Sequence, residues 1–168
     1  PSNSKKSTEN NLMTSSIDLK KKLEEIEIRK QIDKFEKNMH YFDDQPTFFV
    51  VLAHLKLKIM DLEGALNYMN EAYKISPKDE FIYENRANVL FKLKDYNGAL
   101  MNLNQAIELN PHMDSYYSRR GNALVKLKIY SGAIHDYTKA IEINNLNESC
   151  FFNRGLAKGC LNDIGGAI

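Results

Sequence analysis

Apolar and small residues recur along most of this chain with a period of 34 residues. Alanines keep that spacing in two columns, Ala65, Ala99, Ala133 and Ala167, and Ala72, Ala106 and Ala140. The same spacing holds for a column of small residues and a column of aromatic residues, which are Ala53, Ala87, Gly121 and Gly155, and Phe49, Tyr83, Tyr117 and Phe151. A period held over several copies predicts a repeat architecture in which each unit packs on its neighbours.

Each unit has the pattern of two amphipathic helices. In the third unit the first stripe falls at i, i+3, i+4 and i+7, and a second stripe follows a break near residues 128–130. The two stripes are Tyr117, Arg120, Gly121 and Leu124, and then Ala133, Tyr137, Ala140 and Ile141. Small residues at Gly121 and Ala133 let the helices approach closely, so a larger side chain at Ala99 or Ala133 is expected to cost about 1–3 kcal/mol through overpacking.

The order of these positions resembles the tetratricopeptide repeat, in which aromatic, small, bulky and alanine residues recur in a fixed order before a proline. The copies that match best span residues 83–111 and 117–145. The first copy is looser, with Leu62 and Met69 where the family has aromatic residues, and the last copy lacks most of its second helix. The resemblance implies an all-α fold: a right-handed superhelical array of antiparallel helix pairs, a solenoid, with an N-terminal capping helix.

We predict three segments along the chain. Residues 1–15 form a flexible polar tail, residues 16–45 form a long charged helix that caps the array, and residues 46–168 form the array. The helix is expected to begin at a capping box of Ser15 and Asp18 and to continue to Asp44, since no Gly or Pro interrupts it. The array divides into units 46–79, 80–113 and 114–147 and an incomplete unit 148–168.

The predicted N-terminal helix carries two apolar stripes on nearly opposite faces. The longer stripe is in frame with the second-helix core positions of a preceding repeat and consists of Ile28, Ile32, Phe35, Met39 and Phe42. We interpret it as the face that caps the first repeat, as repeat arrays require. The shorter stripe of Leu19, Leu23 and Ile26 is either a coiled-coil or dimer contact or simply the apolar side of a fraying helix.

Arginine recurs at Arg86, Arg120 and Arg154, a position where the family often has leucine. We predict that Arg120 buries its aliphatic stem and pairs with Asp136 on the partner helix. At the same place in the preceding repeat Arg86 faces Asn102, which carries no charge and is therefore expected to be the weaker counterpart.

The resemblance implies that the first helix of each unit lines a concave wall on which family members bind peptides. The candidate binding residues of this wall are Asn85, Asn88, Arg119, Asn122, Asn153, His54, Lys58, Lys92 and Lys126. Asparagine amides suit an extended peptide because each offers a donor and an acceptor, although this chain is rich in Asn throughout. The lysine column either attracts acidic peptides or complements the dipoles of the helices that it ends.

Some members of the family grip the C-terminal carboxylate of heat-shock chaperones with a Lys–Asn–Asn–Lys–Arg clamp. Asn85 and Arg119 match this clamp, whereas the remaining positions hold Val50, His54 and Ser115. A shift by one repeat places a glutamate at the first lysine. The resemblance therefore does not imply binding of chaperone tails by that clamp.

Composition and charge argue against several other classes of function. The net charge is +1 and no basic and aromatic surface is visible, so nucleic acid is not an expected partner. The longest apolar run, residues 48–53, is too short for membrane insertion, and no secretory signal is visible. Two cysteines without neighbouring histidines suit a reducing compartment, so we expect an intracellular, cytoplasmic protein. Abundant Lys, Asn, Ile and Tyr suggest an A+T-rich genome such as that of a protist.

The sequence predicts no catalytic, cofactor-binding or metal-binding constellation. The histidines are scattered without the paired spacing of metal ligands. The glycines near the C-terminus lack the Lys-Ser/Thr ending of a phosphate loop. We therefore expect that this chain is not an enzyme and carries no cofactor or metal.

Three hypotheses about function follow. The first is a protein–protein interaction scaffold whose groove holds an extended peptide or a partner helix. The second is a regulatory or targeting arm of a larger protein, an enzyme included, because the chain opens on Pro1 and stops at Ile168 inside a predicted helix. The third is self-association through the N-terminal helix. A repeat scaffold does not identify its ligand, so the sequence leaves the partner open.

Overall fold

The computed structural model describes the backbone of residues 2–41 and 45–165, and the side chains of residues 17–39, 41 and 45–162. These residues form helices joined by short turns, and no strand occurs among them. After the long helix α1 (Ser2–Asn38) and a 3₁₀ turn (Met39–Tyr41) come α2 (Gln45–Lys58), α3 (Leu62–Ile75), α4 (Glu80–Lys92), α5 (Tyr96–Leu109), α6 (Asp114–Lys126), α7 (Tyr130–Ile143) and α8 (Glu148–Gly165). The predicted all-α repeat array is confirmed.

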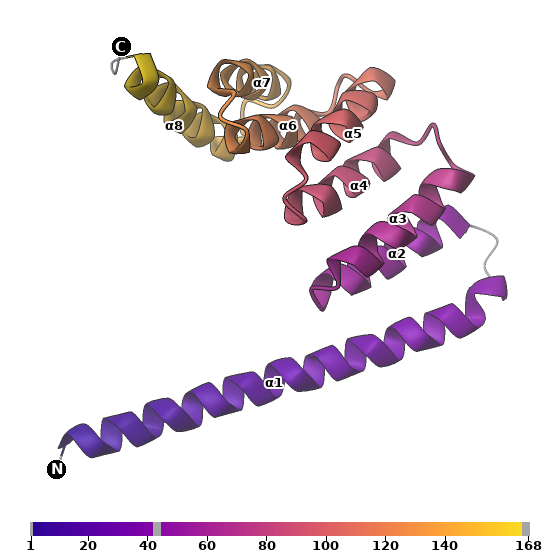
Figure 1. Cartoon of the computed structure of the whole chain (residues 1–168), viewed down its shortest axis with the longest axis vertical. Helices are drawn as coiled ribbons and strands as arrows, with labels where there is room; N and C mark the ends of the chain where they lie inside the picture. The colour runs from indigo at the N-terminus through magenta and orange to yellow at the C-terminus, as the bar shows by residue number, and fades with distance from the viewer. Residues whose placement is uncertain (1, 42–44, 166–168) are drawn as a thin grey trace.

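The array is built from helix pairs that stack in sequence order (Figure 1). The pairs are α2 with α3, α4 with α5, and α6 with α7, and α8 packs on α7 as the first helix of a further unit. Apart from Gln45, the first residue of α2, each pair falls within one 34-residue unit of the sequence pattern. Ala167, which continues the alanine column, lies outside the described residues.

A turn of three residues joins the helices of each pair, and its middle residue has a left-handed backbone. These middle residues are Met60, Lys94 and Lys128, with φ of 59°, 65° and 62°. One residue later, the amides of Asp61, Asp95 and Ile129 each donate to a carbonyl five residues earlier at 2.9 Å. Such a 6→1 bond satisfies a carbonyl that the helix end would otherwise leave unpaired. The turn is thus part of the repeat.

Aspartate begins the second helix in the first two pairs. The carboxylates of Asp61 and Asp95 accept hydrogen bonds at 2.9 Å from the amides of Gly64 and Gly98. A Cβ atom at Gly64 would lie 2.5 Å from the Oδ2 atom of Asp61, which explains why glycine stands beside each cap. The third pair has Ile129 at this place and no side-chain cap.

Small residues form the contact between the helices of each pair. Six alanines of the two described columns have no solvent exposure: Ala65, Ala72, Ala99, Ala106, Ala133 and Ala140. Because they carry no side chain beyond Cβ, the helix axes come close, and larger residues such as Met69, Leu103 and Tyr137 fill the space beside them. The 34-residue period of the alanine columns therefore arises from the packing of the helices in the core.

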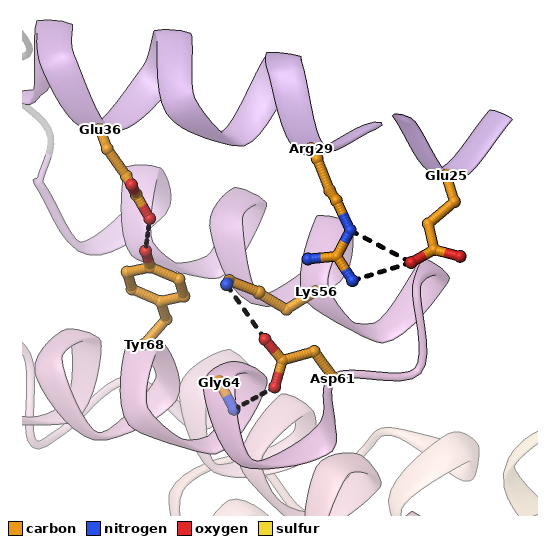
Figure 2. A network of polar contacts seen from close by, with 7 residues as sticks. All are labelled: Glu25, Arg29, Glu36, Lys56, Asp61, Gly64 and Tyr68. Carbon is orange, nitrogen blue, oxygen red and sulfur yellow. Dashed lines mark hydrogen bonds and ion pairs between the residues drawn. The ribbon is translucent and has the colours of Figure 1, made fainter. Parts of the chain in front are cut away.

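Helix α1 covers the open end of the first pair. Ile28 and Ile32 are 8% and 3% exposed, and they pack with Phe48, Leu52 and Leu55 of α2. A polar contact holds the same interface, since the hydroxyl of Tyr68 in α3 donates to the Glu36 carboxylate of α1 (Figure 2). Burial, together with this hydrogen bond, raises the pKa of Tyr68 above its ordinary value.

The ends of α1 differ from the prediction. The helix begins at Ser2, so it includes the segment predicted as a flexible polar tail, and Ser15 and Asp18 lie inside it rather than at its start. No Gly or Pro occurs between residues 2 and 38 to end the helix. The helix stops at Asn38, whose side-chain amide donates to the Lys34 carbonyl at 2.7 Å, and a 3₁₀ turn follows. The predicted end at Asp44 is thus too late.

The apolar stripes of α1 separate cleanly by burial. Leu19, Leu23 and Ile26 are 60%, 59% and 50% exposed, while the opposite stripe lies against the array. Met39, in the 3₁₀ turn, is 37% exposed and does not continue the buried stripe as predicted, because the helical geometry ends before it. Phe42, the last predicted member, lies outside the described residues.

Candidate functional site

A groove runs along the first helices of the repeats. One hollow of about 460 Å³ is lined mainly by α4, α6 and the α4–α5 turn, by Ala87, Asn88, Phe91, Lys92, Lys94, Tyr96, Leu103, Arg119, Asn122 and Lys126. A second hollow of about 360 Å³ shares three of these residues and continues onto α8, with Val125, Tyr137, Asn153, Leu156, Ala157 and Cys160. We call the two hollows together the groove.

The groove brings together most of the residues predicted as binding residues. Asn88, Lys92, Arg119, Asn122 and Lys126 line its first hollow, and Asn122, Lys126 and Asn153 line its second. They come from three different repeats. A ligand that follows the groove would therefore touch several repeats at once.

Three predicted residues lie elsewhere. Asn85 is only 8% exposed, and its side-chain amide donates to the Phe81 carbonyl one turn earlier at 2.8 Å. The prediction that Asn85 faces a ligand therefore does not match its geometry, because the side chain folds back on its own helix. His54 and Lys58 are exposed on α2 but line neither hollow of the groove.

A hydrogen-bonded cluster of amides forms the middle of the groove. The Oδ1 atom of Asn122 accepts from the Tyr137 hydroxyl at 2.7 Å and from the Asn153 amide at 3.3 Å. Tyr137 reaches this place from α7 because Gly121 leaves room for its ring. Burial raises the pKa of Tyr137 from 10.0 to about 12, so its hydroxyl stays protonated and donates. Asn122 is thereby fixed with its NH₂ group available for a ligand.

Four basic side chains line the first hollow of the groove: Lys92, Lys94, Arg119 and Lys126. The Nε atom of Arg119 pairs with Glu84 at 3.0 Å, and Glu84 also accepts from the Ser115 hydroxyl. No ion pair within the described part of the chain includes Lys92, Lys94 or Lys126. Lys92 and Lys126 are also the last residues of α4 and α6, where a positive charge complements the helix dipole. The groove is therefore lined by basic side chains, and the Glu84 carboxylate that pairs with Arg119 lies outside its lining.

The groove becomes apolar toward α8. Leu156 is 55% exposed and stands in the register of Asn122 and Asn88, and Phe152, four residues earlier, is 67% exposed. Cys160, one turn further on, is exposed and free. Residues four apart share a helix face, so these side chains form an apolar strip on α8. Leu156 and Cys160 of this strip line the groove, and Phe152 lies outside its lining.

Sequence reasoning missed several groove residues. Phe91 and Val125 line it and stand 34 residues apart, so the repeat period itself could have identified them once Asn88 and Asn122 were placed. Lys94 and Tyr96 come from the turn and the start of α5 rather than from a first helix. The sequence pattern of the first helices, from which the groove was predicted, therefore could not identify those two residues.

Among the described residues, no group of three or more His, Cys, Asp and Glu side chains is placed to hold a metal ion. No described helix combines the length and the apolar character that a membrane span requires.

Two family models match the middle part of the chain. One family model, described as TPR repeat, matches residues 87–128, and another, described as Tetratricopeptide repeat, matches residues 114–145. No curated protein sequence matches the chain. The matched residues comprise the C-terminal part of α4 and all of α5, α6 and α7, and they include every residue that lines the first hollow of the groove.

Solved structures share the fold at low sequence identity. The first TPR of Spaghetti (RPAP3), bound to the HSP90 peptide SRMEEVD, is similar with a TM-score of 0.69 and 22% identity, over 72% of this chain and 96% of that one. The TPR2B domain of yeast Sti1 in a pHsp70 complex has a TM-score of 0.64 and 25% identity, over 68% and 97%. A tetratricopeptide repeat protein from Parabacteroides merdae has a TM-score of 0.75 and 19% identity, over 84% and 56%.

Proposed function

Because the chain is a tetratricopeptide repeat protein, we propose that it is an interaction scaffold whose groove binds an extended peptide or a helix of a partner protein. The observation that carries this proposal is the continuity of the groove, which passes from α4 across α6 to α8. Asn88, Asn122 and Asn153 offer amides along it, and these can bond to the backbone of any extended segment. The scaffold itself performs no reaction.

The charges and the apolar strip indicate the chemistry of the partner segment. Lys92, Lys94 and Lys126 favour acidic side chains over α4 and α6. Phe152 and Leu156 favour a large apolar side chain over α8. The partner segment is therefore acidic where it crosses α4 and α6 and apolar where it crosses α8. The HSP90 peptide bound by the first TPR of Spaghetti (RPAP3) contains acidic residues, so an acidic ligand is compatible with a groove of this fold.

The groove does not favour capture of a free C-terminal carboxylate. Arg119, the basic residue that matches the chaperone clamp, is paired with Glu84 at 3.0 Å. A terminal carboxylate beside Arg119 would meet the negative charge of Glu84. We therefore expect an internal segment of the partner rather than its C-terminus.

A pull-down from lysate with mass spectrometry tests this function. The bait chain is compared with the double variant Lys92→Glu/Lys126→Glu and with Lys78→Glu/Lys158→Glu, which changes the net charge equally outside the groove. Circular dichroism first establishes that all three proteins are equally helical. Partners that bind the wild type and the control variant but not the groove variant support the proposal. Partners retained by all three proteins place the binding site elsewhere on the molecule.

Self-association through α1 is the second candidate function. The exposed stripe of Leu19, Leu23 and Ile26 lies on the side of α1 that faces away from the array, and a two-stranded coiled coil would cover it. Light scattering of the wild type and of the variant Leu19→Ser/Leu23→Ser/Ile26→Ser measures the mass in solution. A dimeric wild type and a monomeric variant support self-association, and a monomeric wild type rejects it.

The scaffold can also serve as a regulatory or targeting arm of a larger protein, an enzyme included. In that case the groove binds the protein that localises or regulates the larger protein, and another domain carries the activity. The sequence that flanks residues 1–168 in the full-length transcript tests this use directly. A neighbouring catalytic domain supports it, and a transcript that encodes repeats alone rejects it.

A further inference from the structure

The arginines that recur with the repeat period have unequal partners. In the third unit the guanidinium of Arg120 donates to both carboxylate oxygens of Asp136, at 2.8 and 2.7 Å, and to the side-chain carbonyl of Asn104 at 2.8 Å. Arg120 thus links α5, α6 and α7, and the predicted pair with Asp136 is confirmed. The hydrogen bonds to Asp136 raise the pKa of the guanidinium further.

Arg86 stands in the same register on α4 but has no carboxylate. Asn102 stands at the position that Asp136 has in the third unit, and its Oδ1 atom accepts a hydrogen bond from Arg86 at 3.5 Å. This bond is longer than each of the hydrogen bonds that Arg120 donates. The Nε atom of Arg86 is buried without a hydrogen-bond partner. The Oδ1 atom of Asn70, which corresponds to that of Asn104, is also buried without a partner. No ion pair among the described residues includes Arg86.

A hollow opens over Arg86 between the second helices of the first two pairs. Its volume is about 400 Å³, and its lining includes Tyr73 of α3, Tyr83 of α4, and Met101, Asn102 and Gln105 of α5. The guanidinium lies 5.0 Å from the centre of the Tyr73 ring, which holds it in place by a cation–π contact. Apart from Arg86 and the amides, the walls are aromatic or apolar.

The hollow and the groove are separate surfaces. No residue that lines the hollow over Arg86 also lines the groove. The hollow lies among α3, α4 and α5, whereas the groove lies along α4, α6 and α8. A ligand of the hollow would therefore not compete with a peptide in the groove.

We propose that the hollow over Arg86 binds an aspartate or glutamate side chain of a partner protein, which supplies to Arg86 the carboxylate that Asp136 supplies to Arg120. A guanidinium presents parallel N–H groups that match a carboxylate, and a buried donor without a partner gains most from such a match. Met101 is 70% exposed at the rim and would contact the apolar part of the partner's side chain. The Arg120–Asp136 pair within this chain thus shows the geometry that we expect between Arg86 and the partner's carboxylate.

Nuclear magnetic resonance of the arginine side chains tests this site on the whole chain. The Nε–H signal of Arg86 is identified by its loss in Arg86→Lys, and sodium acetate is then titrated against sodium chloride at equal ionic strength. We expect the Arg86 signal to shift and saturate with acetate, with half-saturation on the order of 10–100 mM, and not with chloride. The Arg120 signal is expected to stay unchanged because Asp136 already occupies it.

The variant Asn102→Asp provides the matched control. It places a carboxylate where Asp136 stands in the next unit, so the Arg86 signal should move to the position of a paired arginine before any acetate is added. Acetate should then no longer shift it. An Arg86 signal that follows chloride and acetate alike in the wild type would overturn the proposal. A response to inorganic phosphate without a response to acetate would also overturn it, since the proposed ligand is a carboxylate.

Discussion

Single residues decide how closely the helices of a pair approach. The ring of Tyr137 fills the space that a side chain at Gly121 would take. A Cβ atom added to Gly121 would lie 2.8 Å from the Cε1 atom of Tyr137 and 3.0 Å from its Cδ1 atom. Tyr137 is 1% exposed and is hydrogen-bonded to Asn122, so its ring cannot move aside freely. The same contact therefore sets the packing of α6 on α7 and the position of a groove amide.

Gly121→Ala is expected to destabilise the fold by about 1–3 kcal/mol because the added methyl group overpacks the Tyr137 ring. Gly155 stands one period later in α8, and a Cβ there would meet nothing within 4 Å. Gly155→Ala is therefore expected to stabilise the helix by about 0.5–1 kcal/mol through helix propensity alone. Urea unfolding followed by circular dichroism measures both variants. Equal effects of the two substitutions would contradict the packing argument.

Asp136→Asn is a second test at the residue scale. Asp136 is 2% exposed, and among the described residues it is the acidic group that forms an ion pair with the largely buried guanidinium of Arg120. Asparagine keeps the shape but removes that charge, so we expect a loss of about 1–3 kcal/mol in the free energy of unfolding. Glu142→Gln, in the exposed pair with Lys139, is expected to change it by less than about 0.5 kcal/mol. A thermal melt of each variant checks the difference.

Whole elements show what the residue pattern determines and what it does not. The repeat period predicted the paired helices, their small contact columns and the Arg120–Asp136 pair, because these follow from which face of a helix a residue occupies. It did not predict the ends of α1 or the rotation of the Asn85 side chain onto the Phe81 carbonyl. Both depend on local competition for backbone hydrogen bonds, which leaves no periodic trace. Lys94 was missed for a similar reason, since it lies in a turn.

One face of α1 packs on α2 and the opposite face is exposed, so substitutions on the two faces are expected to differ in their effect on stability. Ile32→Ala removes a side chain that is 3% exposed against Phe48 and Leu52 of α2, so the loss is expected to be about 2–4 kcal/mol. Leu23→Ala, on the opposite face at 59% exposure, is expected to cost less than about 0.5 kcal/mol. Chemical unfolding at a concentration where the protein is monomeric makes the comparison. A large loss in Leu23→Ala would show that the exposed stripe is covered in solution.

Over the whole molecule, buried tyrosines connect neighbouring repeats. Burial raises the pKa of Tyr116, which packs on the second pair, and of Tyr137, which lies in one core cluster with Cys150 and Ala157 of α8, from 10.0 to about 12 each. Both side chains are 3% exposed or less. Each folded tyrosine therefore holds its proton at a pH where the unfolded chain has already released it. The stability of the array is linked to pH through these interfaces.

The stability of the fold is consequently expected to fall at alkaline pH. Because the folded-state pKa lies above the unfolded value, the contribution of each tyrosine is fully present below about pH 10 and is lost as the pH rises from about 10 to about 12. In that range each group lowers the free energy of unfolding by about 1.4 kcal/mol per pH unit. Urea midpoints measured between about pH 8 and about pH 11 should decline, and Tyr137→Phe should flatten the decline. Tyr130→Phe, at a partly exposed ring, serves as the control, and an equal slope in both variants would exclude Tyr137 as a source of the linkage.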